Sequence, residues 1–198
     1  MDVNASTPAL RRVVWLVALL NLAYFGVEFS VAAAIGSVSL FADSVDFLED
    51  ASINLLILMA LGWGAAARAR AGLALSAILL VPGLATLWTA WQKFSAPAPP
   101  APLALSLAGL GALAVNLACA LVLARFKGHA GSLTRAAFLS ARNDALANVA
   151  IVAAGLATAS TLSAWPDLVV GLAIAAVNAD AAREVFEAAR RERREAQA

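Results

Sequence analysis

Apolar residues fill this chain in long blocks that are separated by short polar loops. An α-helix needs about 20 apolar residues to cross the roughly 30 Å hydrocarbon core of a bilayer. Blocks of that length recur along the sequence, so the pattern predicts an all-α, polytopic membrane protein with six transmembrane helices. The predicted spans are 13–35, 39–64, 71–92, 103–125, 135–159 and 165–186. Together they predict one transmembrane domain over 1–198.

Composition supports a multi-pass integral membrane protein and excludes several other classes. Hydrophobic residues make up 62% of the 198-residue chain, and the mean hydropathy is +0.82. The first apolar block is too long for a cleavable signal peptide and contains Asn21 and Glu28. A net charge of +1 gives no electrostatic support for binding nucleic acid. The single Cys119 excludes an intramolecular disulfide and a thiolate-rich metal cage.

Basic residues fix the expected orientation in the membrane. All of the 14 Lys and Arg residues except Lys93 and Arg142 fall at the ends of the predicted spans that share one side. The positive-inside rule then places both termini in the cytoplasm, and we expect a bacterial inner (cytoplasmic) membrane. The Pro-rich run 94–102 is expected to join two halves of three helices each. We expect no C-terminal cytoplasmic domain, because only a short charged tail follows the last span.

The two halves share short sequence elements. Asn21-Leu22-Ala23 recurs as Asn116-Leu117-Ala118. Asp50-Ala51 with Asn54 recurs at nearly the same offset as Asp144-Ala145 with Asn148. An odd number of spans in each half would make this 3+3 repeat inverted in the membrane. Inverted repeats with a binding site near the midplane are common among alternating-access transporters.

Four acidic residues interrupt the second apolar block, namely Asp43, Asp46, Glu49 and Asp50. A charged side chain at the centre of a bilayer costs about 2.5–3.5 kcal/mol on insertion scales, so such residues usually mark a function. At about 100° per residue, Asp43, Asp46, Asp50 and Asn54 fall within an arc of roughly 80° on one helix face. Glu49 lies to the side of that arc. The face predicts a row of oxygen ligands.

The fifth predicted helix supplies a matching face. Ser140, Asp144 and Asn148 recur at every fourth position and therefore share one stripe. We expect a metal site made by Asp46, Asp50 and Asp144, with a weaker ligand from Ser140, Asn148 or water. Such carboxylates suit Zn²⁺ at about 2.0–2.2 Å and also admit harder ions such as Mn²⁺. The secondary or pathway candidates are Asp43, Glu49, Glu28 and Asn54.

The second helix resembles the signature of the cation diffusion facilitators, the cation efflux family. The pattern G-S-x-[AS] followed by D-[AS]-x-[HD]-x-x-x-D is met by Gly36 to Ser39 and by Asp43 to Asp50. In the fifth helix the family carries [HD]-x-x-x-D, where this chain has Ser140 to Asp144. The resemblance implies an exchanger of a divalent metal ion, often Zn²⁺, against protons. It also implies that Asp46, Asp50 and Asp144 bind the transported ion.

Two departures qualify the resemblance. Ser140 replaces the usual His or Asp, which leaves the metal open: Zn²⁺ is our first choice with Cd²⁺ as its mimic, and Mn²⁺, Fe²⁺ and Co²⁺ stay open. The family's cytoplasmic domain is the other difference, so we expect a homodimer to form through the membrane helices. We expect no enzyme, because no D-D-x-x-D motif or phosphate-binding Gly loop occurs. The alternatives are a membrane metal sensor or adaptor without transport, and a passive cation channel.

Overall fold

The computed structural model describes residues 3–60, 83–124 and 131–178. These residues form helices and connecting loops, and no strand occurs among them, which confirms the all-α prediction. The helices are α1 (Val3–Ile35), α2 (Val38–Ala60), a segment over 83–95, α4 (Pro102–Ala124), α5 (Gly131–Thr161) and Trp165–Asn178. The end of the predicted span 39–64, the first part of 71–92 and the end of 165–186 lie outside the described residues.

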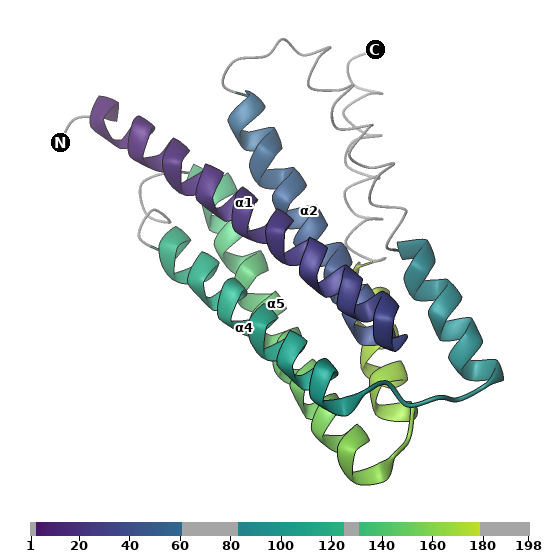
Figure 1. Cartoon of the computed structure of the whole chain (residues 1–198). Coiled ribbons are helices and arrows are strands. Elements are labelled where there is room, and N and C mark those ends of the chain that lie inside the picture. Colours follow the sequence, from purple (N-terminus) through teal and green to yellow (C-terminus); the bar gives the residue numbers. More distant parts are fainter. Residues whose placement is uncertain (1–2, 61–82, 125–130, 179–198) are drawn as a thin grey trace, which may run out of the picture.

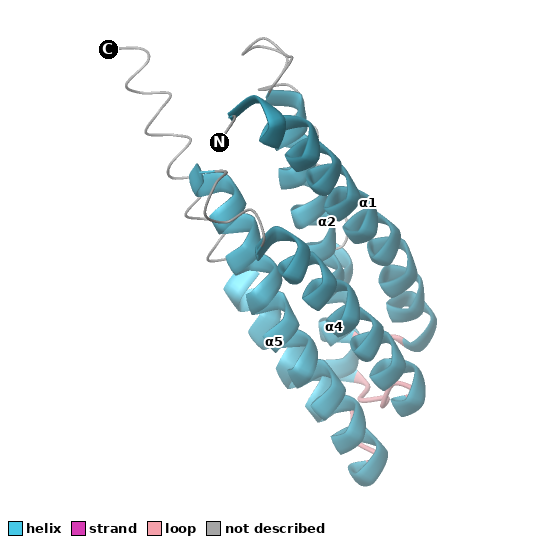
Figure 2. Cartoon of the chain, turned by 90° about the vertical axis from the view of Figure 1, so that its left-hand side faces the viewer, coloured by secondary structure: helices cyan, strands magenta, loops and turns pink. Residues whose placement is uncertain are grey.

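Two helical hairpins form the centre of the molecule. α1 pairs with α2 and α4 pairs with α5, while α1 also packs on α4 and α2 on α5. Figure 1 shows that α1 and α4 run in opposite directions, as do α2 and α5. The second view shows the same four helices side by side along one common direction (Figure 2). The two halves are therefore related as an inverted repeat, as the sequence predicts.

Small residues allow the helices to approach closely. A Cβ on Gly109 would meet the side chain of Ile151, and one on Gly155 would meet Ser106, so both glycines bring α4 and α5 together. A Cβ on Gly171, in the helix Trp165–Asn178, would meet the backbone of Val38 at the start of α2. Membrane helices pack through such small residues because lipid provides no hydrophobic drive for association. Gly171 therefore sets how closely the last helix lies against α2.

The buried core is apolar and joins both halves. One cluster contains Ala32 of α1, Leu40 of α2, Leu105 of α4, Ile151 of α5 and Ile174 of the last helix. Cys119 is buried in a second cluster and packs there as a small hydrophobic residue, as expected. Large apolar side chains also cover the outside, where lipid would meet them; examples are Leu19, Leu107, Leu121, Leu156 and Val177.

Three described helices are long and apolar enough to cross a membrane, namely Pro8–Ile35, Pro102–Ala124 and Ala141–Thr161. The helix Trp165–Asn178 is apolar but shorter within the described residues. α2 is long enough and yet differs in composition, because it carries four carboxylates. The helix that least resembles a membrane span is thus the one that sequence patterning selects as functional.

Candidate metal site between three helices

A cavity of about 170 Å³ lies where α2, α5 and the last helix meet. α2 contributes Asp46, Glu49 and Asp50, and α5 contributes Asp144 together with Asn143. At 1.5 Å per residue, Asp46 and Asp50 lie about 12 and 18 Å along the axis from the start of α2 at Val38. Both residues therefore lie away from the start of α2, in a cavity that is partly open, since its Asn143 and Val177 are exposed. Three of its residues, Asp46, Asp50 and Asp144, are the predicted primary ligands.

The four carboxylates lie close enough to interact. The Asp46 carboxyl is within electrostatic reach of Asp144, Glu49 and Asp50. Among the described residues that line the cavity, none is basic. Like charges in a site of low dielectric need a counter-charge, which either a cation or protons can provide. The arrangement is therefore suited to bind a divalent cation in competition with protons.

The carboxylates that line the cavity are too far apart to coordinate one ion together as they stand. Across the described parts of the chain, no three His, Cys, Asp or Glu side chains are grouped tightly enough to hold an ion as they stand. The cavity is instead open enough for water, since one water molecule takes about 30 Å³ of liquid volume. A cation bound here would retain water ligands or draw the carboxylates inward.

The cavity faces a different arc of α2 from the one the helical wheel favours. Glu49, which the wheel sets aside, lines the cavity, whereas Asn54 does not. Val177 and Asn178 of the last helix complete the lining of the cavity. Asn54 instead donates its Nδ2 to the Asp50 carbonyl oxygen at 2.8 Å, a bond within its own helix.

A second buried polar group lies nearer the start of α2 and contains Asp43. Asn148 of α5 donates its Nδ2 to the Asp43 Oδ2 at 2.6 Å, and Asn116 of α4 donates to the Asn148 Oδ1 at 3.1 Å. Asn148, a predicted metal ligand, therefore uses both ends of its amide outside the cavity lining. Asn116 makes the interhelical hydrogen bond that its type and burial lead one to expect.

Glu28 of α1 belongs to this second group. Its carboxyl is fully buried, faces Asp43 and receives no hydrogen bond from a described protein donor. Two carboxylates only accept hydrogen bonds, so they can be joined only by a proton that they share. The predicted pathway residues Glu28 and Asp43 are thus adjacent, although they are separate from the residues that line the cavity. Ser140 lies in α5, but its side chain is outside the described residues, so its role as a ligand stays a prediction.

Sequence reasoning missed Asp167, the buried carboxylate at the other end of the molecule. Lys93 donates its Nζ to the Asp167 Oδ2 at 2.7 Å. The hydroxyls of Ser37 and Ser39 donate to the Oδ1 at 2.6 and 2.7 Å. The backbone N–H groups of Val38 and Ser39 also bind this carboxylate, at 3.0 and 3.1 Å. One carboxylate thus connects α2, the segment over 83–95 and the last helix.

This junction explains the first half of the G-S-x-S signature. Gly36 has a φ of 63° and closes the turn between α1 and α2, a conformation that favours glycine. The Ser37 Oγ accepts a hydrogen bond from the Leu40 N–H at 3.2 Å, which makes Ser37 the N-cap of α2. Asp167 binds the next two free N–H groups. Lys93 lies apart from the basic residues that gather on the predicted cytoplasmic side. This position in the sequence could have indicated that Lys93 pairs with a carboxylate such as Asp167.

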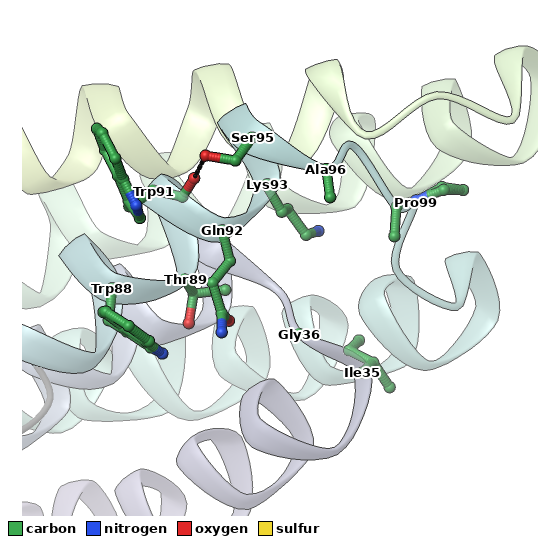
Figure 3. A pocket seen from close by; sticks show the side chains of 11 residues that line it. Ile35, Gly36, Trp88, Thr89, Trp91, Gln92, Lys93, Ser95, Ala96 and Pro99 are labelled. Atoms are coloured by element: carbon green, nitrogen blue, oxygen red, sulfur yellow. Dashed lines mark hydrogen bonds between the residues drawn. The ribbon is translucent and has the colours of Figure 1, made fainter.

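A larger cavity, of about 550 Å³, lies beside this junction and has a different character (Figure 3). Trp88, Thr89 and Gln92 line it from the segment over 83–95, and Ile35 and Gly36 line it from the turn after α1. Among its described lining residues there is no carboxylate, and its Lys93 is already paired with Asp167. The larger cavity therefore lacks the chemistry for a cation, and the smaller acidic cavity is the candidate site.

The apolar helices define a polytopic membrane protein, and the acidic cavity between them is its candidate cation site. The sequence matches the family described as the cation efflux transmembrane domain over residues 14–192, and the chain belongs to that family. It is a divalent cation transporter of the cation diffusion facilitator kind. No curated protein matches the chain.

Proposed function

We propose that this protein exports a divalent metal cation across the membrane in exchange for protons, by alternating access. The observation that carries the proposal is the cavity lined by Asp46, Glu49, Asp50 and Asp144 between two helices of opposite halves. Zn²⁺ is the ion that the resemblance implies, with Cd²⁺ as its mimic. The location in a bacterial inner membrane and the homodimer through the membrane helices stay predictions.

Proton exchange follows from the chemistry of the site. Carboxylates bind a metal ion only when they are deprotonated, so metal ions and protons compete for the same oxygens. When the metal leaves, protons can neutralise the carboxylates while the empty site returns to the other side of the membrane. The buried pair of Glu28 and Asp43, with Asn148 donating to Asp43, is a second place where a proton can reside within the bundle.

The inverted repeat supports alternating access. α2 and α5 occupy equivalent positions in the two halves and present equivalent residues to the cavity, Asp50 with Asp144 and Glu49 with Asn143. Rocking of this helix pair against the others can expose the site to one side and then the other.

Flux into liposomes tests the proposal. Purified protein should move Zn²⁺ at a rate that rises with an imposed pH gradient, and the metal flux should be accompanied by an opposite proton flux. The Asp50→Ala variant should lose this flux. Unchanged flux in that variant would show that the cavity is not the transport site. Metal flux without proton movement would indicate a passive channel, and metal binding without flux would indicate a sensor.

A further inference from the structure

The third wall of the acidic cavity carries a polar residue that the family resemblance does not assign. Asn178 and Val177 belong to the last helix and line the cavity opposite the carboxylates of α2 and α5. At the repeat offset of 94 or 95 residues, Asn178 corresponds to Leu84 or Gly83, neither of which has a polar side chain. The amide of Asn178 is therefore a feature of one half only, placed at the cation site.

A hydrogen bond orients this amide. The Asn178 Nδ2 donates to the carbonyl oxygen of Ala42, one turn before Asp46 on α2, at 3.4 Å. Only the NH₂ end of an amide can donate to a carbonyl oxygen, so the assignment of nitrogen and oxygen is fixed by the partner. The carbonyl oxygen of the amide is then the end left to face the cavity.

Asn143, the other amide in the lining, is oriented the opposite way. Its Oδ1 accepts a hydrogen bond from the Arg142 guanidinium at 3.3 Å. An oxygen engaged by a cationic donor is a poor ligand for a second cation. Of the two asparagines that line the cavity, Asn178 is therefore the one that can offer an oxygen to a metal ion.

The described lining supplies oxygen ligands only. Besides the four carboxylates and the two amides, it contains Val177 and no His, Cys or Met side chain. Carboxylate, carbonyl and water ligands suit harder ions that prefer six-fold coordination, such as Mn²⁺, whereas tetrahedral sites with nitrogen or sulfur ligands suit Zn²⁺. A volume of about 170 Å³ also leaves room for several waters at about 30 Å³ each.

We propose that Asn178 is a metal-binding residue whose amide oxygen completes an oxygen-only, partly hydrated site that prefers Mn²⁺ over Zn²⁺. This inference rests on the proposed transport function and assigns the last helix a direct part in selectivity. The last helix would then sense the bound ion, because the amide bridges the metal and the α2 backbone at Ala42.

Metal preference is the quantity to measure. Full-length protein in liposomes is assayed with Mn²⁺ and with Zn²⁺ separately, and Mn²⁺ binding to the purified protein is followed by the loss of the free-ion signal in electron paramagnetic resonance. Wild type should bind and transport Mn²⁺ in preference to Zn²⁺. Asn178→Ala should weaken Mn²⁺ binding by on the order of tenfold, the lower end of the loss found when a supporting group of a metal site is removed.

Two further variants separate a ligand from a structural residue. Asn178→Asp keeps an oxygen ligand and should retain Mn²⁺ transport, while Asn178→His adds a nitrogen ligand and should raise the ratio of Zn²⁺ to Mn²⁺ flux. Asn116→Ala is the matched control. It also removes a buried interhelical amide, but one that binds Asn148 away from the cavity. It should leave the ratio of the two fluxes at the wild-type value even if the protein becomes less stable.

Two results overturn different parts of the account. If the Mn²⁺ to Zn²⁺ ratio is the same in wild type, Asn178→Ala and Asn178→His while Asp50→Ala abolishes flux, transport stands and the role of Asn178 falls. If wild type moves neither ion, the proposed function itself falls. A wild-type preference for Zn²⁺ over Mn²⁺ would also overturn the inference.

Discussion

The carboxylate of Asp167 and the four carboxylates of the acidic cavity lie in the same bundle and differ in what surrounds them. Asp167 receives five hydrogen bonds, one of them from the Lys93 ammonium. The described lining of the acidic cavity places four carboxylates together without a basic side chain, and Glu28 of α1 receives no hydrogen bond from the described residues. A carboxylate whose charge the protein neutralises holds the fold together. A group of carboxylates whose described lining holds no basic side chain suits a positively charged partner from outside, and that is what a transport site needs.

The comparison predicts that removing the charge of Asp50 mainly reduces transport, whereas removing that of Asp167 mainly reduces stability. Asp50→Asn should reduce metal transport by at least about 100-fold, because it removes a charged ligand from the central site. The same variant should cost the metal-free protein less stability than Asp167→Ala does, because it also relieves the repulsion between Asp50 and Asp46. Liposome flux and thermal unfolding in detergent check the two halves of this prediction. A marked loss of stability would show that Asp50 is structural.

Asp167→Ala should show the reverse pattern, with stability as the first property lost. Removing one partner of a buried ion pair leaves the other uncompensated and typically costs about 3–5 kcal/mol. The variant also leaves two N–H groups at the start of α2 without an acceptor. Thermal unfolding of the purified protein measures the loss. Asp167→Asn, which keeps one acceptor oxygen, should be less destabilised, and an unchanged unfolding midpoint in both would show that the junction contributes little.

Bound metal should stabilise the protein through the cavity and not through the junction. A ligand at 100 times its dissociation constant stabilises the folded state by about 2.7 kcal/mol. Wild type should therefore unfold at a higher temperature when Mn²⁺ or Zn²⁺ is added, and Asp50→Asn should not respond. Ser39→Ala, which removes one hydroxyl donor to Asp167, should still respond fully. A metal response in Asp50→Asn would place the ion elsewhere.

The smallest effect is expected at the turn that leads into the junction. Gly36→Ala places a Cβ on a residue with φ of 63°, which costs about 1–2 kcal/mol. Gly26→Ala is the control, because Gly26 lies inside α1 with open space around the position of its Cβ. That substitution should be neutral or stabilising by up to about 1 kcal/mol. Chemical or thermal unfolding measures the change in the free energy of unfolding for each variant. Equal changes in the two variants would show that the positive φ of Gly36 does not matter for stability.

The helices and the meeting of Asp46, Asp50 and Asp144 at one cavity were predictable because they follow from periodicity. Apolar blocks of membrane length predict helices, and the spacing of Asp46 and Asp50 places them one turn apart on one face. The match between Asp50 and Asp144 in the two halves predicted that these residues meet, and they line one cavity. The apolar blocks and the spacing of the aspartates are local patterns, which can be read from consecutive residues of one helix.

The remaining features depend on how helices rotate against one another, which periodicity does not determine. The wheel set Glu49 aside because its angle lies outside the arc of Asp46 and Asp50, whereas the cavity is lined by Glu49 and by two residues of the last helix. Asn148 lies on the predicted stripe and binds Asp43 instead of lining the cavity. The pairing of Lys93 with Asp167 joins residues from two separate helices, and no local pattern links them.

Proton release on metal binding tests the central claim most directly. Metal ions added to weakly buffered, purified protein should release protons into solution, because the ion displaces them from the cavity carboxylates. Asp46→Asn and Asp50→Asn should each reduce both the metal bound and the protons released, while Ser39→Ala should change neither. Metal binding without proton release, or undiminished release in both cavity variants, would contradict the assignment of these carboxylates as the exchange site.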